Sequence, residues 1–495
     1  MRHAFAAVVA ALVLTGCAVG PDFRQPPAPT AGAYTATPLP AETAAAPVEG
    51  GESQRFVSGL GIPSRWWELF QSAPLDTLIR QALADSPTLA AAQAKLREAL
   101  ENRRAQFGAL FPSVDGNASV TRQKISGASF GQPDSNFSAF TLYNASVNVS
   151  YGLDLFGGTR RELEALQAQV DYQHYQLEGA HLTLASNIVT IAVQEASLRA
   201  RVRATREIIA AGEQQLKLVD RQFQLGGASR SDLLAQQAQL AQVTATLPPL
   251  EKELAQTRHQ LAVLAGRLPG DAAQLPEFEL TDLQLPPDLP VSLPSALVRQ
   301  RPDIRAAEEL LHAASAQVGV ATAHLYPQIT LSGSLGTAAT GVQDMFTTGT
   351  GVWSLGAGLL QPIFRGGELT AKRRAAIAAY DQAEAQYRET VLQAFQNVAD
   401  VLCALELDAR SLAAQATAET AARDSLDLTE KQFRIGAVGY LSLLNAQRQH
   451  EQARISLAQA QAARFADSAA LFQALGGGWW NQKPEGGSLT TSHND

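Results

Sequence analysis

Apolar residues recur at every seventh position through two long parts of the chain. The first part runs from Gly157 to Leu225 and contains no proline. Its heptad positions are Val170, Leu177, Leu184, Ile191 and Leu198, with a companion series at Ile188, Val202, Ile209, Leu216 and Phe223. In the second part, the residues spaced by seven or its multiples are Ile377, Val391, Val398, Leu405, Leu412, Leu426 and Phe433. Heptads sustained over this length predict helices that supercoil against neighbours, each on the order of 100 Å long at about 1.5 Å per residue.

A pattern with a period of two occupies four shorter segments. In these segments small or apolar residues alternate with polar ones, as Val147 and Val149 alternate with Asn148 and Ser150. We expect β-strands near residues 112–122, 143–155, 327–337 and 351–363. The alternation is typical of a membrane-spanning strand, and equally of a half-buried strand in a soluble sheet.

Glycines interrupt the pattern at the end of each long helix. Gly226 and Gly436 stand where the chain has to reverse, and a residue without a side chain suits such a turn. After Gly226, a helical run covers residues 229–266, a proline-rich connector covers 269–294, and another helix is expected at 295–325. We expect these two shorter helices to return together along the length of the long helix.

The two long helices belong to two copies of one repeat. FQLGGASRSDLLAQQ at 223–237 matches FRIGAVGYLSLLNAQ at 433–447, and LADSPTLAAAQ matches VRQRPDIRAAE further upstream. ALFPSV with HLYPQI, and LFGG with IFRGG, match in the same order. The repeat predicts a duplicated fold. Residues 64–297 form the first structural repeat (helix, strand, strand, long helix, turn, helix and connector), and residues 298–480 form the second.

The number of strands has a consequence for assembly. An open sheet of four strands cannot span a bilayer, because the amides at its edges would have no partners. Known membrane barrels contain about eight strands or more. If the strands lie in a membrane, several copies of the chain must pool them, and the helices must then share one ring. The expected object is a hollow tube.

The first residues are typical of a secretory signal. Arg2-His3 precedes a short apolar run, which ends in Leu14-Thr15-Gly16-Cys17. A charged start, an apolar core and small residues before the cleavage site predict a signal peptide at residues 1–16. The ending resembles the bacterial lipobox, in which Cys17 is acylated and becomes the mature N-terminus. The alternative is an ordinary signal peptide with an incidental cysteine.

Neither end of the mature chain shows a clear periodicity. Residues 17–63 are rich in Pro, Ala, Thr and Gly, so we expect an extended, acylated tether without regular structure. Residues 481–495 are expected to be a disordered tail. If Cys17 is acylated, Cys403 has no partner, and its place in a helical pattern predicts a buried free thiol.

Composition and motifs argue against two other classes of protein. The formal net charge of −8 excludes the basic surface that nucleic-acid binding requires. The eight histidines are scattered, without the spacing of metal ligands, and no GxSxG nucleophile motif occurs. The glycines of SLGAGLL at 354–360 alternate within a strand and do not form a phosphate loop. We therefore expect no enzyme activity, no cofactor and no metal.

Several motifs together resemble those of the outer membrane efflux (TolC-like) family, in its lipoprotein branch that serves resistance-nodulation-division pumps. They are LTGC with VGPDF, WWELF at 66–70, APLDTLIRQAL at 73–83, the FGG and FRGG turns, FRIGAVGYLSLLNAQ, and ALGGGWW at 474–480. The resemblance implies a homotrimer with a 12-stranded β-barrel in the outer membrane, continuous with a 12-helix α-barrel in the periplasm. It further implies an exit duct for small molecules such as drugs, working with a periplasmic membrane-fusion adaptor and an inner-membrane efflux pump.

Two alternatives to this function remain open at this stage. One is the outer membrane channel of a type I protein secretion system, and the other is a non-channel periplasmic scaffold lipoprotein made of helices. The scaffold would account for the heptads and the lipobox but not for two copies of paired, alternating strands.

The resemblance also assigns roles to the glycine turns. Residues of the family's adaptor-contacting tips correspond to Gly226, Ser229, Arg230, Ser231 and Leu233 in the first hairpin, and to Arg434, Gly436, Ala437, Val438 and Leu441 in the second. A periplasmic gate would involve Asp232, Leu441, Ser442 and Asn445. Relatives often carry Asp at the last two of these positions. Asp232 has a second possible role, because an acid just after a turn often caps the following helix.

Overall fold

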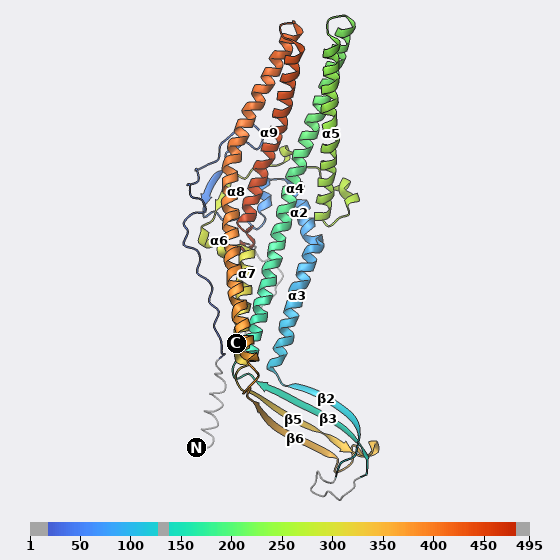
Figure 1. Ribbon diagram of the computed structural model, residues 1–495, viewed down its shortest axis with the longest axis vertical. Coiled ribbons are helices and arrows are strands. Elements are labelled where there is room, and N and C mark those ends of the chain that lie inside the picture. Colours follow the sequence, from blue (N-terminus) through green and yellow to red (C-terminus); the bar gives the residue numbers. More distant parts are fainter. Residues whose placement is uncertain (1–17, 127–137, 482–495) are drawn as a thin grey trace. The chain divides into compact units, whose positions relative to one another are not determined.

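The computed structural model describes residues 18–126 and 138–481 (Figure 1). Cys17, the expected signal peptide and the expected tail after Asn481 lie outside the described residues. The chain divides into two compact units. The first comprises residues 1–26, 95–174 and 306–388, and the second comprises 27–94, 175–305 and 389–495.

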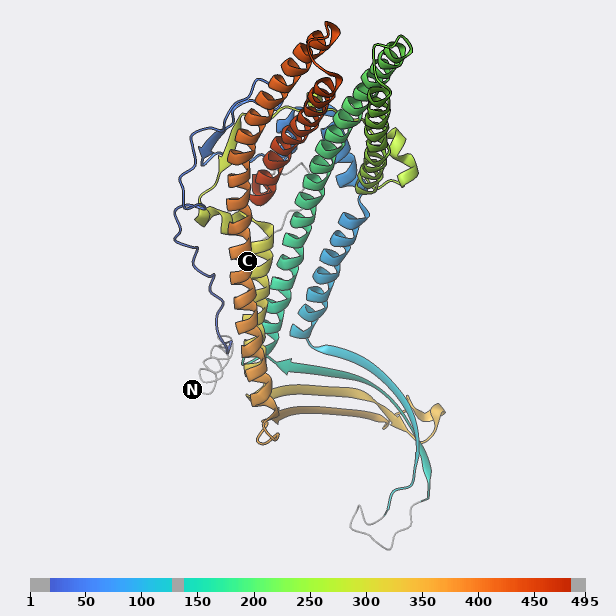
Figure 2. The same cartoon turned by 45° about the horizontal axis from the view of Figure 1, so that its top comes forward.

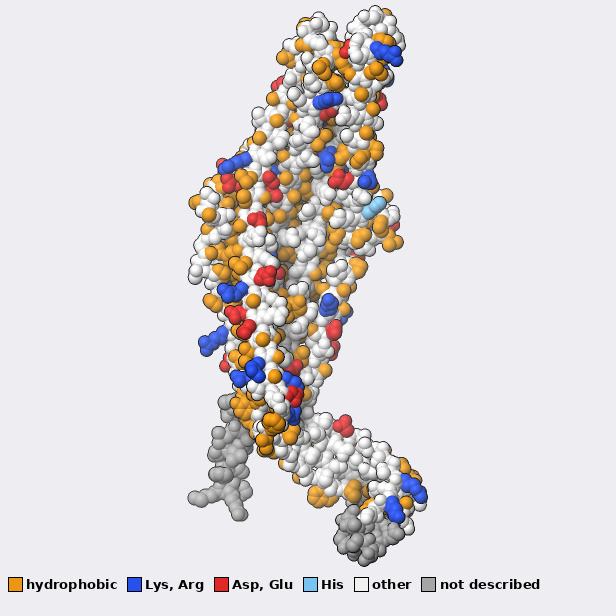
Figure 3. Space-filling model, in the orientation of Figure 1, with side chains coloured by type: hydrophobic (Ala, Val, Ile, Leu, Met, Phe, Trp, Pro, Cys, Tyr) orange, Lys and Arg blue, Asp and Glu red, His pale blue; other side chains and the backbone are white. Residues whose placement is uncertain are grey.

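The first unit contains a four-stranded antiparallel sheet in the order β2-β3-β5-β6. Its strands are β2 (Ser113–Gln123), β3 (Phe140–Leu153), β5 (Gln328–Ala339) and β6 (Gly351–Leu360). Figure 2 shows the four strands as a single curved layer. Every residue of β6 is exposed, and so is all of β2 except Gln123. Few charged side chains lie on the face of the sheet seen in Figure 3.

The long helices are α4 (Gly158–Gln224) and α8 (Glu368–Arg434), and each runs through both units. The heptad series of α4 is buried: Val170, Leu177, Leu184, Ile191 and Leu198 are all at most 9% exposed. Val391, Val398, Leu405 and Leu412 of α8 are likewise at most 8% exposed. The heptads thus mark a buried apolar stripe in the middle of each helix, whereas Phe223 and Ile377, closer to the helix ends, are 38% and 37% exposed.

Each long helix turns into a shorter one at its far end. The chain continues into α5 (Arg230–Leu264) after α4, and into α9 (Tyr440–Ala474) after α8. The free cysteine, Cys403, lies on α8 and is exposed in the single chain. The expectation of a buried thiol is therefore wrong, because this position lies off the buried heptad stripe.

The path of the returning helices differs from the expectation. Helix α5 ends against the junction of α2 (Ala73–Asp85) and α3 (Pro87–Phe107), where a Cβ on Gly266 would lie 2.9 Å from the carbonyl oxygen of Asp85. Helix α9 ends against the junction of α6 (Pro294–Gln300) and α7 (Pro302–Ala323), and Arg301 donates to the carbonyl of Ala474 at 2.8 Å. The expectation that 229–266 and 295–325 return as one pair is therefore wrong.

Proline explains why both junctions exist. Ser86 and Arg301 each precede a proline and adopt extended backbone, with ψ of 120° and 126°. A residue before proline is pushed out of the helical region, so the helix breaks there. For the same reason, the single helix expected at 295–325 is two helices. The broken ends leave backbone carbonyls that the incoming helix end can approach.

The segment expected to be an unstructured tether contains a strand. Strand β1 (Arg55–Ser58) pairs in parallel with β4 (Asp288–Val291) of the connector. Gln54 is fully buried and donates to the carbonyl of Pro286 at 2.9 Å. A single short parallel pair gives too few residues for an alternating pattern, which is why periodicity missed it.

Two of the quoted motifs meet in the core of the second unit. Trp66 of WWELF is 1% exposed, and its ring stacks on that of Phe472 with centroids 5.3 Å apart. Gly477 and Gly478 of ALGGGWW have positive φ, and a Cβ on Gly478 would lie 2.4 Å from the carbonyl oxygen of Ile62. Glycine is required there because the backbones approach too closely for a side chain. No helix among the described residues is long and apolar enough to cross a membrane.

Candidate functional site

The two glycine turns have the same backbone hydrogen bonds. In the first, Gly226 donates to the carbonyl of Phe223 at 3.0 Å and Gly227 donates to that of Gln222 at 2.7 Å. In the second, Gly436 and Ala437 repeat these bonds to the two equivalent carbonyls at 3.0 and 2.9 Å. Gly226 and Gly436 have φ of 77° and 75°. Both long helices therefore end in a Schellman motif, which needs a left-handed residue and favours glycine.

The helices that leave the two turns begin differently. Ser229 caps α5: its hydroxyl accepts from the amide of Asp232 at 3.2 Å, and the Asp232 carboxylate accepts from the amide of Ser229 at 3.0 Å. This reciprocal capping box lowers the pKa of Asp232, chiefly through the hydrogen bond from the Ser229 side chain. Helix α9 follows Gly439, which offers no side-chain cap within the described structure.

A small apolar cluster joins the two hairpins near the turns. Its buried members are Val219 of α4 and Tyr440 and Leu444 of α9, and Leu233 and Phe433 pack against them. The rings of Phe433 and Tyr440 meet edge to face, with centroids 5.9 Å apart. We call this set the tip cluster. It binds the second hairpin to the first through side chains from all four helices.

Sequence reasoning did not single out Tyr440 or Val219, two buried members of the tip cluster. Tyr440 is the larger of the two. It is 8% exposed, and its hydroxyl has no hydrogen-bond partner among the described residues. Burial raises the pKa of Tyr440 to about 12, and the nearby Asp232 carboxylate contributes to the rise. A signal was present in the sequence, because Tyr440 follows Phe433 by seven residues and so continues the heptad series across the turn.

The residues expected to contact an adaptor or to form a gate lie around the tip cluster. Gly226, Ser229, Arg230, Ser231, Arg434, Gly436 and Ala437 are exposed, and Leu233 and Val438 are partly buried. Leu441 is 68% exposed, and Ser442 and Asn445 are also exposed. The structure thus gathers the named residues of both hairpins near one end of the second unit. Asp232 acts as a helix cap there.

Polar contacts connect the hairpins further along the helices. Arg448 of α9 donates to the side chain of Gln239 of α5 at 2.6 Å, and Arg454 of α9 pairs with Glu207 of α4 at 2.6 Å. A cavity of about 280 Å³ lies between the helices and is lined by Gln236, His450 and Glu451, among others. Burial raises the pKa of Glu451.

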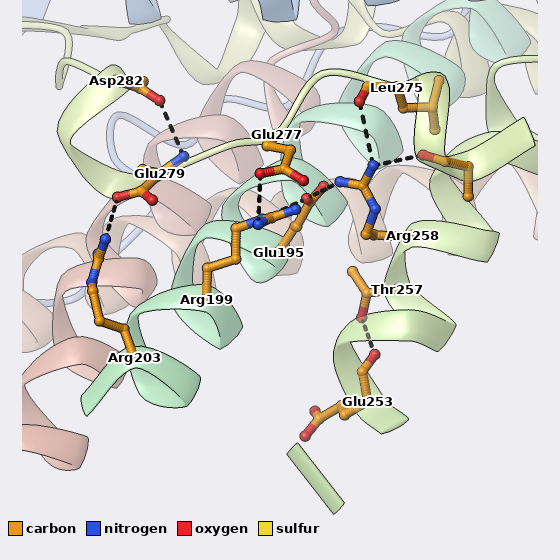
Figure 4. Close-up of polar contacts among 11 residues, drawn as sticks. Glu195, Arg199, Arg203, Glu253, Thr257, Arg258, Leu275, Glu277, Glu279 and Asp282 are labelled. Carbon is orange, nitrogen blue, oxygen red and sulfur yellow. Dashed lines mark hydrogen bonds and ion pairs between the residues drawn. The ribbon is translucent and has the colours of Figure 1, made fainter. Parts of the chain in front are cut away.

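An ionic cluster fixes the connector to the first hairpin (Figure 4). The fully buried Glu195 of α4 accepts from Arg199 at 2.9 Å and from Arg258 of α5 at 2.5 Å. Arg258 also donates to the carbonyls of Ala272 and Leu275, at 2.6 and 3.3 Å. The buried carboxylate is compensated by two guanidinium groups, as burial of a charge requires.

A second polar cluster fixes the N-terminal segment to α8 and α9. The fully buried Arg464 donates to the carbonyl of Leu405 at 3.0 Å, to the hydroxyl of Thr43 at 3.1 Å and to the carbonyl of Glu52 at 3.4 Å. Asp467 lies one turn further along α9 and shares a hydrogen bond with the carboxyl of Asp408. Burial, with the Asp408 charge next, raises the pKa of Asp467 to about 7. We call Asp408, Arg464 and Asp467 the Arg464 cluster.

The sites described above are contacts between helices and between segments of the second unit. Among the described residues, no three His, Cys, Asp or Glu side chains come together as metal ligands. Of the two carboxyl groups with a raised pKa, Asp467 lies beside Asp408 and Arg464, and Glu451 lines the cavity of about 280 Å³.

Comparisons with known proteins agree over most of the chain. A family model described as outer membrane efflux protein matches residues 78–267 and 293–477. The pyoverdine export outer membrane protein OpmQ of Pseudomonas aeruginosa is 31% identical over 456 residues, which cover 91% of this chain and 95% of that protein. The probable efflux pump outer membrane protein TtgC of Pseudomonas putida is 29% identical over 477 residues, 96% of this chain and 95% of TtgC.

Solved structures show the same fold. The outer-membrane channel OprN superimposes with a TM-score of 0.83 at 29% identity, covering 94% of this chain and all of that one. The open state of the MtrE outer membrane channel of Neisseria gonorrhoeae has a TM-score of 0.79 at 26% identity, covering 94% of this chain and 99% of the MtrE chain.

Proposed function

Because the chain belongs to the outer membrane efflux protein family, we propose that it forms, as a homotrimer, the exit duct of a tripartite efflux system. Small molecules would reach the duct from an inner-membrane pump through a periplasmic adaptor and leave through the outer membrane. Relatives named for pyoverdine export and for efflux pumps support small molecules as the substrate class.

The observation that carries this proposal is that the four-stranded sheet has exposed faces and two unpaired edges. Its strands form one layer, β2 and β6 are exposed on both faces, and no described strand pairs with their outer edges. Unpaired amides are not tolerated in hydrocarbon, so a membrane sheet has to close on itself. Three copies supply twelve strands, which is within the range of known barrels.

Two measurements test the duct. The purified protein should run as a trimer on unheated gels and should conduct ions in planar bilayers. Deletion of its gene should sensitise cells to compounds that the partner pump exports, and re-expression should restore resistance. A water-soluble monomer without conductance would refute the duct and favour a periplasmic scaffold. Trimers and conductance with loss only of a secreted protein would favour a type I secretion channel.

The tip cluster and the residues around it would form the periplasmic end of the duct. We assign adaptor contact to Gly226, Ser229, Arg230, Ser231 and Leu233 of the first hairpin, and to Arg434, Gly436, Ala437, Val438 and Leu441 of the second. The exposure of most of these side chains and backbone turns supports this assignment. Leu441, Ser442 and Asn445 would narrow the closed duct, with Asp232 keeping the first hairpin in shape.

Acylation of Cys17 would add a lipid anchor to the barrel. The described residues that follow Cys17 contact α4 and the segment just before it. Arg161 of α4 pairs with Asp22 at 2.6 Å, and the amide of Val19 donates to the carbonyl of Phe156 at 3.0 Å. Mass spectrometry of the purified chain tests the acylation: a diacylglyceryl and an acyl group on Cys17 are expected, and an unmodified N-terminus at another residue would refute it.

A further inference from the structure

An aromatic contact joins the two repeats at one end of the sheet. Phe156 follows β3, and its ring stacks on that of Tyr326, which precedes β5. The ring centroids are 4.7 Å apart and the planes differ by 17°. The two strands are paired beside this contact, with Leu153 opposite Ile329. The two stacked rings thus lie at the boundary between the first and the second repeat. We call this boundary, where β3 and β5 pair, the seam.

Because the chain is duplicated, a second pair of aromatic residues occupies the equivalent positions. Phe111 stands before Pro112 at the start of β2, as Tyr326 stands before Pro327 at the start of β5. Phe364 stands before a glycine pair and α8, as Phe156 does before α4, with one additional residue, Arg365, in between. Among the residues that the structure describes, the second pair of rings makes no equivalent contact, because β2 and β6 are opposite edges of the sheet.

The second pair is correspondingly open. Phe111 is 58% exposed and Phe364 is 88% exposed, and Ile363 beside it is 94% exposed. The helices that follow the strands show the same contrast. Early α4 packs on α7, where Gln317 donates to Glu162 at 3.3 Å, whereas residues 370–375 of α8 are all exposed. The edge formed by β6 and the first residues of α8 therefore packs against no other described part of the chain.

We propose that Phe364 of one copy stacks on Phe111 of the next copy, so that the seam between copies repeats the seam within each chain. This inference rests on the proposed homotrimer, which brings the β6 edge of one copy beside the β2 edge of another. Phe107, whose ring meets that of Phe111 edge to face at 5.5 Å, extends the receiving surface. Apolar rings left in water at both edges gain by covering each other, and stacked pairs add to that gain.

The alternative contact partner of these exposed rings is lipid, because aromatic residues also collect at membrane interfaces. The internal repeat favours a second copy over lipid. In the first seam, the equivalent rings contact each other, and Phe156 is only partly exposed. Within one chain, Phe156 of the first repeat contacts Tyr326 of the second repeat. The equivalent residues are Phe364 of the second repeat and Phe111 of the first repeat. They can make the same contact between two neighbouring copies.

Site-directed cross-linking in outer membranes tests the proposal. The chain carries Phe111→Cys and Phe364→Cys together with Cys403→Ser, and membranes are treated with a short bismaleimide before denaturing electrophoresis. Because each copy has both cysteines at opposite edges, a ring should yield covalent dimers and closed covalent trimers. Each single variant should remain monomeric. The Phe156→Cys, Tyr326→Cys chain is the matched control, and its cross-link should stay within one chain.

A second pair separates proximity from random collision. Phe346 is 84% exposed and lies between β5 and β6, at the far end of these strands. Phe111→Cys combined with Phe346→Cys should give only background cross-linking. Equal cross-linking yields from both pairs would overturn the proposed stacking of Phe364 on Phe111. So would the absence of covalent oligomers from the Phe111, Phe364 pair while unheated gels still show trimers. Either result would leave the proposed duct standing. Loss of trimers in the unsubstituted protein would instead refute the proposed function.

An aspartate substitution provides an independent readout without cross-linker. Phe364→Asp should lower the temperature at which trimers dissociate in detergent, because a charge then faces the neighbouring ring. Phe346→Asp should leave this temperature unchanged. The same shift in both variants would contradict the proposal.

Discussion

Replacing Asp467 with asparagine should make the protein more stable at pH 8 and leave its stability at pH 4 nearly unchanged. Asp467 is mostly buried beside Asp408, and the fully buried Arg464 is the cation of this cluster. Glu52 is the other charged group that acts on Arg464. Two carboxylates that share a hydrogen bond cannot both ionise cheaply, so the folded protein retains one proton between them.

The sign follows from the raised pKa. The pKa of Asp467 in the folded chain is about 7, above its ordinary value of 3.8. Between pH 4 and pH 7 the folded state therefore binds more protons than the unfolded state, and stability falls as the pH rises through this window. Above about pH 7 the penalty is complete, because both states are then ionised.

The magnitude follows from the same two values. A span from 3.8 to about 7 corresponds to at most about 4 kcal/mol, at roughly 1.4 kcal/mol for each tenfold change. Because the proton is shared with Asp408, the value belongs to the pair and a smaller effect of about 2 kcal/mol per chain is the working expectation. Asparagine imitates the protonated acid, donates a hydrogen bond to Asp408 and removes the penalty.

The assay is thermal unfolding of the detergent-solubilised protein, followed by circular dichroism from pH 4 to pH 9. The midpoint of the unsubstituted protein should fall relative to that of Asp467→Asn as the pH rises, with the two meeting near pH 4. Asp427→Asn, an exposed aspartate on α8, is the matched control and should run parallel to the unsubstituted protein. Parallel curves for Asp467→Asn as well would refute the shared proton.

Further substitutions address the tip and the connector. Leu441→Ala, or a charge at Leu441, should loosen the closed tip and raise both single-channel conductance and antibiotic leak; unchanged values would count against a gate there. Ser229→Ala should destabilise the first turn of α5 by about 1 kcal/mol, seen as faster hydrogen exchange in that turn, whereas an unchanged rate would contradict the cap. Tyr440→Phe should preserve or raise the thermal midpoint because the lost hydroxyl has no described partner, while Tyr440→Ala should cost about 3–5 kcal/mol; equal losses would argue against ring packing. Glu195→Ala should cost about 3–5 kcal/mol because Arg199 and Arg258 stay buried nearby, whereas Glu251→Ala, at a surface pair, should cost less than about 1 kcal/mol.

The long elements could be read from the sequence because their signals are redundant. The proline-free segment from Gly157 to Leu225 differs by a single residue at each end from α4, Gly158–Gln224. Its heptads, the glycine at its end and the matching second copy all point to the same helix. The family could likewise be predicted, because motifs spread over most of the chain agree with one another.

Features that depend on contacts between distant segments could not be read in this way. The pairing of β1 with β4 joins Arg55 to Asp288, and neither segment is long enough to show a period. The meeting of α5 with the α2–α3 junction depends on the space left by Ser86-Pro87, which local pattern does not reveal. Tyr440 is a related case, because its burial comes from contact with Val219 of the other hairpin, which a local pattern does not reveal.

The two hairpins are held in shape by different means, and this bears on how the tip could open. The first hairpin stabilises itself, because Ser229 and Asp232 satisfy each other's amides at the start of α5. The second begins at Gly439 without a described side-chain cap, and its first helical residue, Tyr440, is buried against Val219 of the first hairpin. A partner that offers Tyr440 another apolar surface would therefore release the second hairpin while the first keeps its shape. The first turn of α5 is thus held by contacts within its own hairpin, whereas the first turn of α9 is held by contacts with the other hairpin.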